Sequence, residues 1–257
     1  TVRYAWQPFT RGNLVGSDGL PASTFSLAIE RQDDGYECGV SAAFAGCING
    51  HDIVAGGCNF PENPLAPNSR KQYYDDIRVL CDSGTRQIGR LPRATAYGVS
   101  ATTPAGIVMA GGYANREAWL LTLDTTLVAR LTPLPSLPHY IDNAAACAIG
   151  DKVYVAGGNH DGKPSNALLC LEGGKWVSLP PFPGNPRTQA VMAAAPNARG
   201  EICLWLFSGF AGSGDDATLD TDGLVYVPSS RRWQKVAGPR DEHGDPLCVA
   251  GGCAATL

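Results

Sequence analysis

The chain has 257 residues, with 31 glycines, 19 prolines and a formal net charge of −4 at pH 7. This charge gives no reason to expect a nucleic acid or an anionic membrane surface as a partner. No apolar run reaches the length of a membrane span. Abundant glycine and proline with sparse charge favour an all-β fold of many short strands joined by turns.

The chain also contains nine cysteines and no C-x-x-C pair, and several of the cysteines fall within apolar strand patterns. Cysteine packs as a small hydrophobic residue, so we expect free, mostly buried thiols. This cysteine content favours a reducing compartment, the cytoplasm.

A short apolar run that closes on a glycine pair recurs along the chain about every 50 residues. It is found at 53–57, 107–112 and 153–158 and, in weaker form with Ser-Gly, at 204–209. The pattern is typical of a buried strand that ends in a backbone conformation that residues with a Cβ resist. Its recurrence predicts a repeat unit.

Each repeat contains four predicted strands, the first of them made of small residues. Small residues are what a propeller blade needs there, because its inner strands crowd toward a common axis. We expect inner strands at 41–47, 96–100, 143–147 and 189–194. The blades are expected at approximately 40–92, 93–138, 139–185 and 186–240, with a partial blade at 241–257.

The two ends of the chain are predicted to be incomplete blades. Residues 1–39 include one alternating strand at 25–29, and their strands are candidates for completing another blade. Near the other end, Cys253 matches Cys147 of an inner strand, so the chain is expected to stop within a blade. Because a propeller closes its ring to leave no exposed sheet edge, we expect a missing segment or a second chain to complete it.

The glycine pairs, their spacing and the tryptophans in the outer strands resemble kelch repeats. Further segments, in their order, resemble the N-acetylneuraminate (sialic acid) mutarotase or epimerase family, and most closely its cyclically permuted branch. The segments are 41–57, Asn59-Phe60-Pro61, 73–77, 96–100, Gly157-Gly158-Asn159, 162–166 and 186–189. The similarity covers roughly residues 37–257.

This resemblance implies a six-bladed kelch-type β-propeller, of which the chain would hold about four complete blades and the start of another. It also implies an isomerase of carbohydrate metabolism that interconverts the anomers of a sialic acid, and a periplasmic location. Mutarotation needs a base for the anomeric hydroxyl proton and an acid for the ring oxygen. It requires neither a metal nor a redox cofactor, so no cofactor is expected.

Residues at the start of inner strands are expected to reach the mouth of the central channel and bind the sugar. Arg187 is the first choice for holding the substrate carboxylate, because a planar guanidinium forms two hydrogen bonds with it. Gln189 stands beside it, and Tyr97 and Asn143 begin two other inner strands. Ordinary turn or packing roles stay open for Tyr97 and Asn143.

The long connection 59–72 suggests function or disorder by its length alone. The family resemblance places a glutamate a few residues before a basic pair in this loop, where it transfers protons. Here the basic pair is Arg70-Lys71, and proline occupies the acidic position, at Pro67. Arg70, Lys71 and Asn159 are further candidates for binding the sugar. Glu62 is a candidate replacement, and the second candidate acid or base is His160, which follows Asn159; a solvated charge and a loop histidine without a role are the alternatives.

Other constellations do not support a metal site. His51, His139 and His243 have no ligand spacing with one another, which argues against a copper oxidase. The acidic run of Asp215-Asp216, Asp220 and Asp222 lacks the spacing of a calcium loop and is interpreted as a solvated turn.

Two classes of function follow from the sequence. The first is a mutarotase that acts on N-acetylneuraminate or a related sugar, with a neutral sugar as a variant for which Arg187 would be dispensable. The second is a non-catalytic kelch propeller that binds a carbohydrate or a protein partner, since the fold alone does not imply chemistry.

Overall fold

The computed structural model describes residues 2–4, 25–27, 39–61, 68–81, 84–212, 218–252 and 254. The chain divides into two compact units, Thr1–Gly39 and Val40–Leu257. In the first unit, β1 (Val2–Tyr4) pairs antiparallel with β2 (Phe25–Leu27). Within the described residues, nothing helical is long and apolar enough to span a bilayer.

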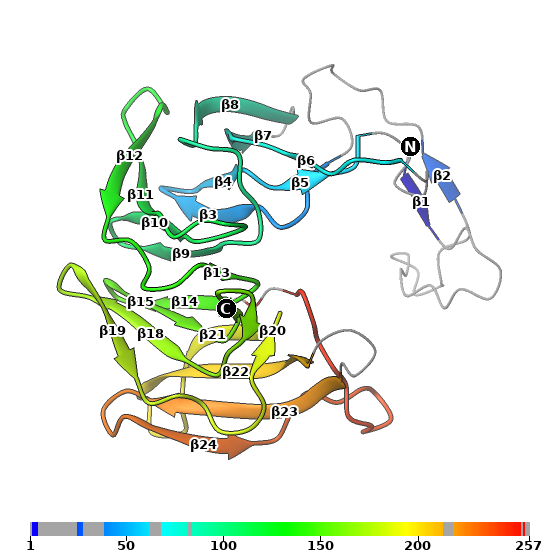
Figure 1. Ribbon diagram of the computed structural model, residues 1–257, viewed down its shortest axis with the longest axis vertical. Helices are drawn as coiled ribbons and strands as arrows, with labels where there is room; N and C mark the ends of the chain where they lie inside the picture. Colours follow the sequence, from blue (N-terminus) through cyan, green and yellow to red (C-terminus); the bar gives the residue numbers. More distant parts are fainter. Residues whose placement is uncertain are drawn as a thin grey trace. The chain divides into compact units, whose positions relative to one another are not determined.

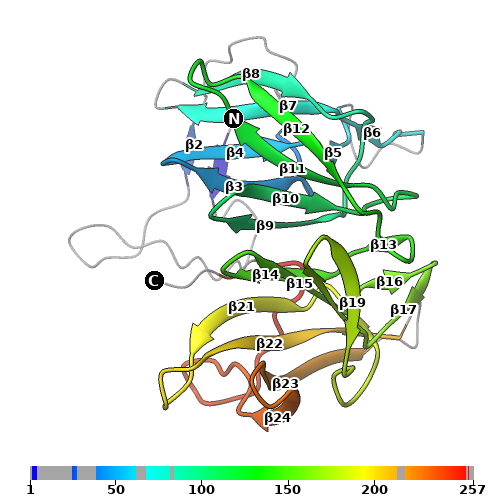
Figure 2. The ribbon, with the colours of Figure 1, turned by 90° about the vertical axis from the view of Figure 1, so that its left-hand side faces the viewer.

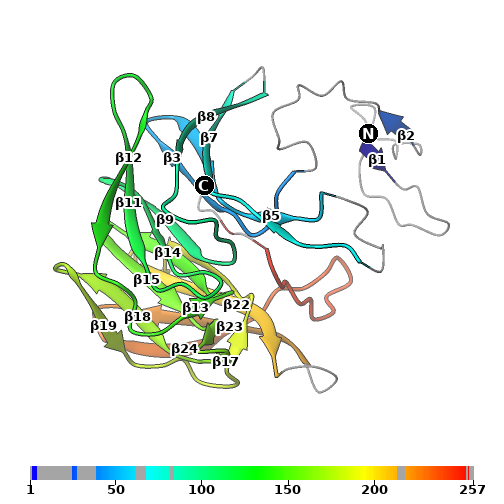
Figure 3. The same ribbon diagram turned by 45° about the horizontal axis from the view of Figure 1, so that its top comes forward.

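The second unit is built mainly of four successive antiparallel sheets, which we call the first to fourth blades; the first three have four strands each, and the fourth has five because β20 joins it. In Figure 3 the sheets follow one another around an arc, and Figure 2 shows them in sequence order from the first blade to the fourth. The strand order within each sheet confirms the expected all-β propeller. The strands are β3 (Phe44–Ile48), β4 (His51–Ala55), β7 (Asp76–Cys81) and β8 (Gly84–Arg90); β9 (Val99–Thr103), β10 (Gly106–Ala110), β11 (Ala118–Leu123) and β12 (Ala129–Leu134); β14 (Ala145–Ile149), β15 (Lys152–Ala156), β18 (Leu168–Glu172) and β19 (Lys175–Leu179); and β21 (Val191–Pro196), β22 (Ile202–Ala211), β23 (Thr218–Val227) and β24 (Arg232–Val236).

Small residues on the inner strands allow the blades to approach one axis. A cavity of about 440 Å³ is lined by β3, β9, β14 and β21, mostly through alanine side chains. The approach is close, since a Cβ built on Gly46 would lie 2.7 Å from Thr102 Oγ1. Ser100 Oγ also donates a hydrogen bond to the Ala45 carbonyl at 2.8 Å. Residues far apart in the sequence therefore meet around an axial channel.

Apolar side chains fill the spaces between neighbouring blades. One cluster, which includes Ile107 and Leu121, joins the first and second blades, and another, which includes Tyr154 and Leu224, joins the third and fourth. The outer tryptophan of a blade also reaches back to the preceding one, because Trp233 Nε1 donates to the Pro180 carbonyl at 2.8 Å. Burial of side chains of this size contributes roughly 1.5–3 kcal/mol each.

The glycine pairs have the backbone conformation predicted for them. Gly158 has a φ of 79°, and a Cβ there would lie 2.6 Å from the Asp142 carbonyl oxygen. Its N–H donates to the Arg187 carbonyl at 2.9 Å, which ties the third blade to the fourth. Glycine is required at this position because it has no Cβ to clash with the neighbouring backbone.

The inner strands begin later than predicted, because the residues before them bond sideways between blades. Ala42, Tyr97, Asn143 and Gln189 all have φ between 52° and 67°. The Tyr97 N–H donates to the Ala42 carbonyl at 2.9 Å. In the same way the Asn143 N–H donates to the Tyr97 carbonyl at 2.8 Å, the Gln189 N–H to the Asn143 carbonyl at 2.8 Å, and the Gly251 N–H to the Gln189 carbonyl at 3.0 Å. We call these five residues the mouth ring. A left-handed φ takes them out of the strand ladder, so the expected strand starts were wrong.

Candidate functional site

The residues of the mouth ring line a cavity of about 290 Å³, which we call the mouth hollow. Three of the predicted binding residues, Tyr97, Asn143 and Gln189, line it together. All of the described residues that line it are uncharged. They are Ser41, Ala42, Tyr97, Gly98, Asn143, Ala144, Gln189, Ala190, Gly251 and Gly252.

Short ribbons beyond the glycine pairs bring further polar residues to the same end of the blades. In Figure 1 the ribbon of β5 and β6 lies to the right of the first sheet. Each ribbon continues the chain past the end of a second strand, so its side chains leave the blade next to the mouth ring. The ribbons are β5 (Cys58–Asn59) with β6 (Gln72–Tyr73); β13 (Ile141–Asp142) with β16 (Asn159–His160) and β17 (Lys163–Pro164); and β20 (Arg187–Thr188) with the end of β22.

Tyr97 is held by groups of the first ribbon. Its hydroxyl oxygen accepts a hydrogen bond from Lys71 Nζ at 2.5 Å and another from Cys58 Sγ at 3.4 Å. Lys71 Nζ also lies 4.9 Å from the centroid of the Tyr97 ring. The hydrogen bond to Tyr97 raises the pKa of Lys71 above its ordinary value, against the effect of burial. Lys71 is therefore a persistent ammonium beside the mouth hollow.

Asp142 connects two of the predicted binding residues. Its Oδ1 accepts hydrogen bonds from Asn143 Nδ2 at 2.7 Å and from Asn159 Nδ2 at 2.8 Å. The sequence reasoning did not single out Asp142. Its position directly before a predicted inner-strand residue was the available signal. The carboxylate fixes both amides, which orients Asn143 at the hollow.

His160 does not line the mouth hollow. Its Nε2 lies 3.1 Å from the Gly157 carbonyl, to which it donates, and its ring centroid is 5.3 Å from that of His139. Burial lowers the pKa of His160, so the ring is neutral at pH 7. The contact with His139 was missed by the sequence reasoning. Among the described residues no group of three or more His, Cys, Asp or Glu side chains is placed to hold a metal ion.

The position of Arg187 corrects the expectation that it clamps a substrate carboxylate. The residue is 1% exposed. Its two terminal nitrogens donate to the two carboxylate oxygens of Asp222, and one of them also donates to the Ser208 carbonyl at 3.2 Å. Nε donates to the Asn185 carbonyl at 3.3 Å. The guanidinium is thus used inside the fourth blade and does not line the mouth hollow.

From the sequence, an acidic run of four residues is interpreted as a solvated turn. For two of them, Asp220 and Asp222, this interpretation was wrong, because both pair with Arg187. Asp220 and Asp222 lie on β23, with Asp220 Oδ2 3.6 Å from Arg187 Nε. Their spacing of two residues places both carboxylates on one face of a strand, and this spacing was the missed signal. The remaining members, Asp215 and Asp216, lie outside the described residues.

The other predicted residues give a mixed picture. Glu62 lies outside the described residues, and Arg70 is exposed. The cysteines within the described part of the chain are free, as expected, and fewer than half of them are fully buried. Cys58, Cys170 and Cys203 are buried, whereas Cys47 and Cys81 are exposed.

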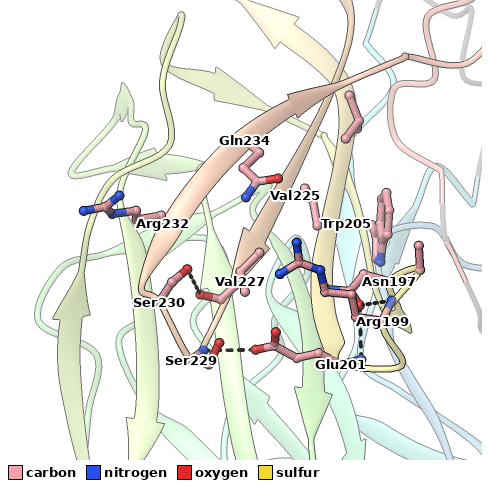
Figure 4. A pocket seen from close by; sticks show the side chains of 12 residues that line it. Asn197, Arg199, Glu201, Trp205, Val225, Val227, Ser229, Ser230, Arg232 and Gln234 are labelled. Carbon is pink, nitrogen blue, oxygen red and sulfur yellow. Dashed lines mark hydrogen bonds between the residues drawn. The ribbon is translucent and has the colours of Figure 1, made fainter.

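A larger cavity, of about 470 Å³, lies on one face of the fourth blade (Figure 4). It is lined by Trp205, Val225 and Val227, which alternate along the strands with residues packed against the third blade. At its rim the Ser229 N–H donates to Glu201 Oε1 at 3.2 Å. This cavity is built from a single sheet, whereas the mouth hollow collects polar side chains from several blades. Convergent polar groups are typical of ligand sites, so the mouth hollow is the candidate site.

Comparison with known proteins gives partial matches to one group of enzymes. No family model matches the chain. Over 116 residues, or 42% of the chain, it is 28% identical to an N-acetylneuraminate epimerase from Yersinia pestis. Over 100 residues, or 34% of the chain, it is 32% identical to an N-acetylneuraminate epimerase from Brucella suis. The matched stretches span 28% and 26% of the lengths of these relatives.

A solved structure, that of YjhT, resembles the chain with a TM-score of 0.59 at 15% identity. The match covers 77% of this chain and 71% of that one, and identity this low shows a shared fold alone. The sequence matches support the resemblance to the mutarotase and epimerase family. The chain is therefore an all-β propeller chain that is similar in sequence to the N-acetylneuraminate epimerases.

Proposed function

We propose that the protein is an isomerase that interconverts the anomers of N-acetylneuraminate or a related sugar in the mouth hollow. The observation that carries the proposal is the convergence of Tyr97, Asn143 and Gln189 on one hollow from three different blades. The partial similarity to proteins named N-acetylneuraminate epimerase supports the choice of a sialic acid as substrate.

In this proposal the hollow binds the sugar through hydrogen bonds. The Asn143 and Gln189 amides offer donors and acceptors for hydroxyl and N-acetyl groups. The ammonium of Lys71, beside the hollow, attracts the substrate carboxylate. Arg187 has no part in binding, because its guanidinium is engaged by Asp222.

A second candidate function is non-catalytic binding of a sugar by the same hollow. The uncharged lining of the hollow favours it, because neutral hydrogen-bonding groups are sufficient to hold a carbohydrate. The two functions share a site and differ in chemistry. An experiment that measures both binding and anomer exchange separates them.

The test is NMR of freshly dissolved N-acetylneuraminate with and without the protein. A mutarotase shortens the time in which the anomer ratio reaches equilibrium, in proportion to the protein concentration. Saturation transfer from protein to sugar, measured on the same samples, reports binding. Binding without faster exchange would replace the isomerase by the second candidate, and neither effect would remove the sugar from the proposal.

A further inference from the structure

We propose that Tyr97 is a catalytic residue whose hydroxyl transfers protons during ring opening, and that Lys71 is a positioning residue that holds this hydroxyl. This proposal rests on the proposed mutarotase function and assigns its chemistry to particular atoms.

Tyr97 has the right chemistry at the right place. Of the described residues that line the mouth hollow, it alone carries a side chain that exchanges protons as an acid or base. The Asn143 and Gln189 amides bind protons too weakly to serve, and Ser41 Oγ already donates to the Cys58 carbonyl at 3.1 Å.

The backbone of Tyr97 is fixed on both sides. Its N–H donates to the Ala42 carbonyl at 2.9 Å, and its carbonyl accepts from the Asn143 N–H at 2.8 Å. The left-handed φ of 67° is uncommon for a bulky residue and is shared by the equivalent residue of each blade, where sideways hydrogen bonds hold it. The side chain therefore leaves a rigid ring at a defined position, which is what a proton-transfer group requires.

Among the described residues, the hydrogen bonds to the Tyr97 hydroxyl leave its own proton free for a ligand. Lys71 and Cys58 both donate to the hydroxyl oxygen, so neither contact uses the hydroxyl hydrogen. A donor that carries a charge also stabilises negative charge that develops on this oxygen. The raised pKa of Lys71 keeps that charge in place at neutral pH.

Ring opening can then proceed with one hydroxyl that first gives and then takes a proton. The Tyr97 O–H protonates the ring oxygen while the bond between that oxygen and the anomeric carbon breaks, and the bonding pair goes to the ring oxygen. The anomeric hydroxyl becomes the carbonyl of the open chain, and its proton passes to the Tyr97 oxygen, which is paired with the Lys71 ammonium meanwhile. The same steps in reverse, on the other face of the carbonyl, give the second anomer.

The test compares anomer exchange in the wild type, Tyr97→Phe and Tyr140→Phe. Tyr97→Phe keeps the ring and removes the hydroxyl, so kcat should fall by ~10²–10⁴-fold while KM changes little. Tyr140→Phe removes a hydroxyl from a half-exposed tyrosine outside the hollow and should leave kcat unchanged. Thermal unfolding of each variant verifies that the fold is retained.

Lys71 is tested by Lys71→Met and Lys71→Arg. Loss of the ammonium should lower kcat by about tenfold, change the alkaline limb of the pH–rate profile and raise KM, because the carboxylate loses its attraction; arginine should restore part of the rate. If the wild type accelerates exchange and Tyr97→Phe does so equally well, this proposal is overturned and the mutarotase function stands. No acceleration by the wild type would overturn both.

Discussion

The protein has two separate polar regions, the surroundings of Arg187 and the mouth hollow. The sequence predicts a single site that contains both. Arg187 and Gln189 are separated by a single residue, and both were expected at the mouth of the channel. Arg187 is 1% exposed and paired with Asp222, whereas Gln189 is exposed and lines the hollow. The first region holds the fourth blade together, and the second is the proposed binding site.

The difference teaches that backbone conformation decides which polar residue reaches the channel. Arg187 lies on β20, which pairs with the end of β22. Gln189 has a φ of 55° and bonds sideways to Asn143. A turn of the backbone between them sends two neighbouring side chains to different surroundings.

The largest effect that would test this contrast is expected from Arg187→Ala. The substitution removes a buried guanidinium and leaves two neighbouring carboxylates, the 18% exposed Asp220 and Asp222, without their cation, so the free energy of unfolding should fall by about 3 kcal/mol. Denaturant unfolding measures the loss. Asp222→Asn, whose parent side chain is 37% exposed, is the milder companion variant and should cost less. Unchanged stability together with lost sugar affinity would return Arg187 to the role of a ligand clamp.

A smaller effect is expected from Gly158→Ala, which disturbs both regions at once. The N–H of Gly158 bonds to Arg187, and a new Cβ would lie 2.6 Å from the Asp142 carbonyl and from Ala144 Cβ. The matched control is Gly162→Ala, because Gly162 has a similar φ of 81° and a Cβ added there would meet nothing within 4 Å. Gly158→Ala should lose about 2 kcal/mol more than the control. Equal losses would show that φ alone matters at this position.

The smallest effect is expected from His160, which lies outside the mouth hollow and donates to the Gly157 carbonyl. It concerns how the free energy of unfolding depends on pH. Burial lowers the pKa of His160 from its ordinary 6.5, so the unfolded chain takes up a proton at a higher pH than the folded chain. Stability from this residue is complete above the unfolded pKa and is lost as the pH falls through the folded value. His160→Gln should therefore flatten the stability difference between about pH 5 and about pH 8. The same slope in both proteins would contradict a buried neutral histidine.

The fold could be predicted from the sequence because its signals are local and repeated. A glycine pair after an apolar run marks the end of a second strand, and Gly158 has the positive φ that the pattern requires. The small residues of the inner strands also predicted the axial channel. The strand starts could not be predicted, since the left-handed φ of Tyr97 or Asn143 depends on hydrogen bonds to the neighbouring blade.

The candidate site was predictable only in part. Tyr97, Asn143 and Gln189 were found from their place before inner strands, and they do line one hollow. The partner of Arg187 was not found, because Asp222 is 35 residues away in the sequence and no local pattern links the two. Whether a cation is paired inside a blade depends on residues that are distant in the sequence.

The most direct test of the account is a titration of the protein with N-acetylneuraminate, followed by NMR signals of both polar regions. The account predicts that the side-chain amide signals of Asn143 and Gln189 shift with added sugar. It also predicts that the Nε–H signal of Arg187 stays where it is, because that group is bonded to the Asn185 carbonyl. A shift of the Arg187 signal with unchanged Asn143 and Gln189 signals would contradict it.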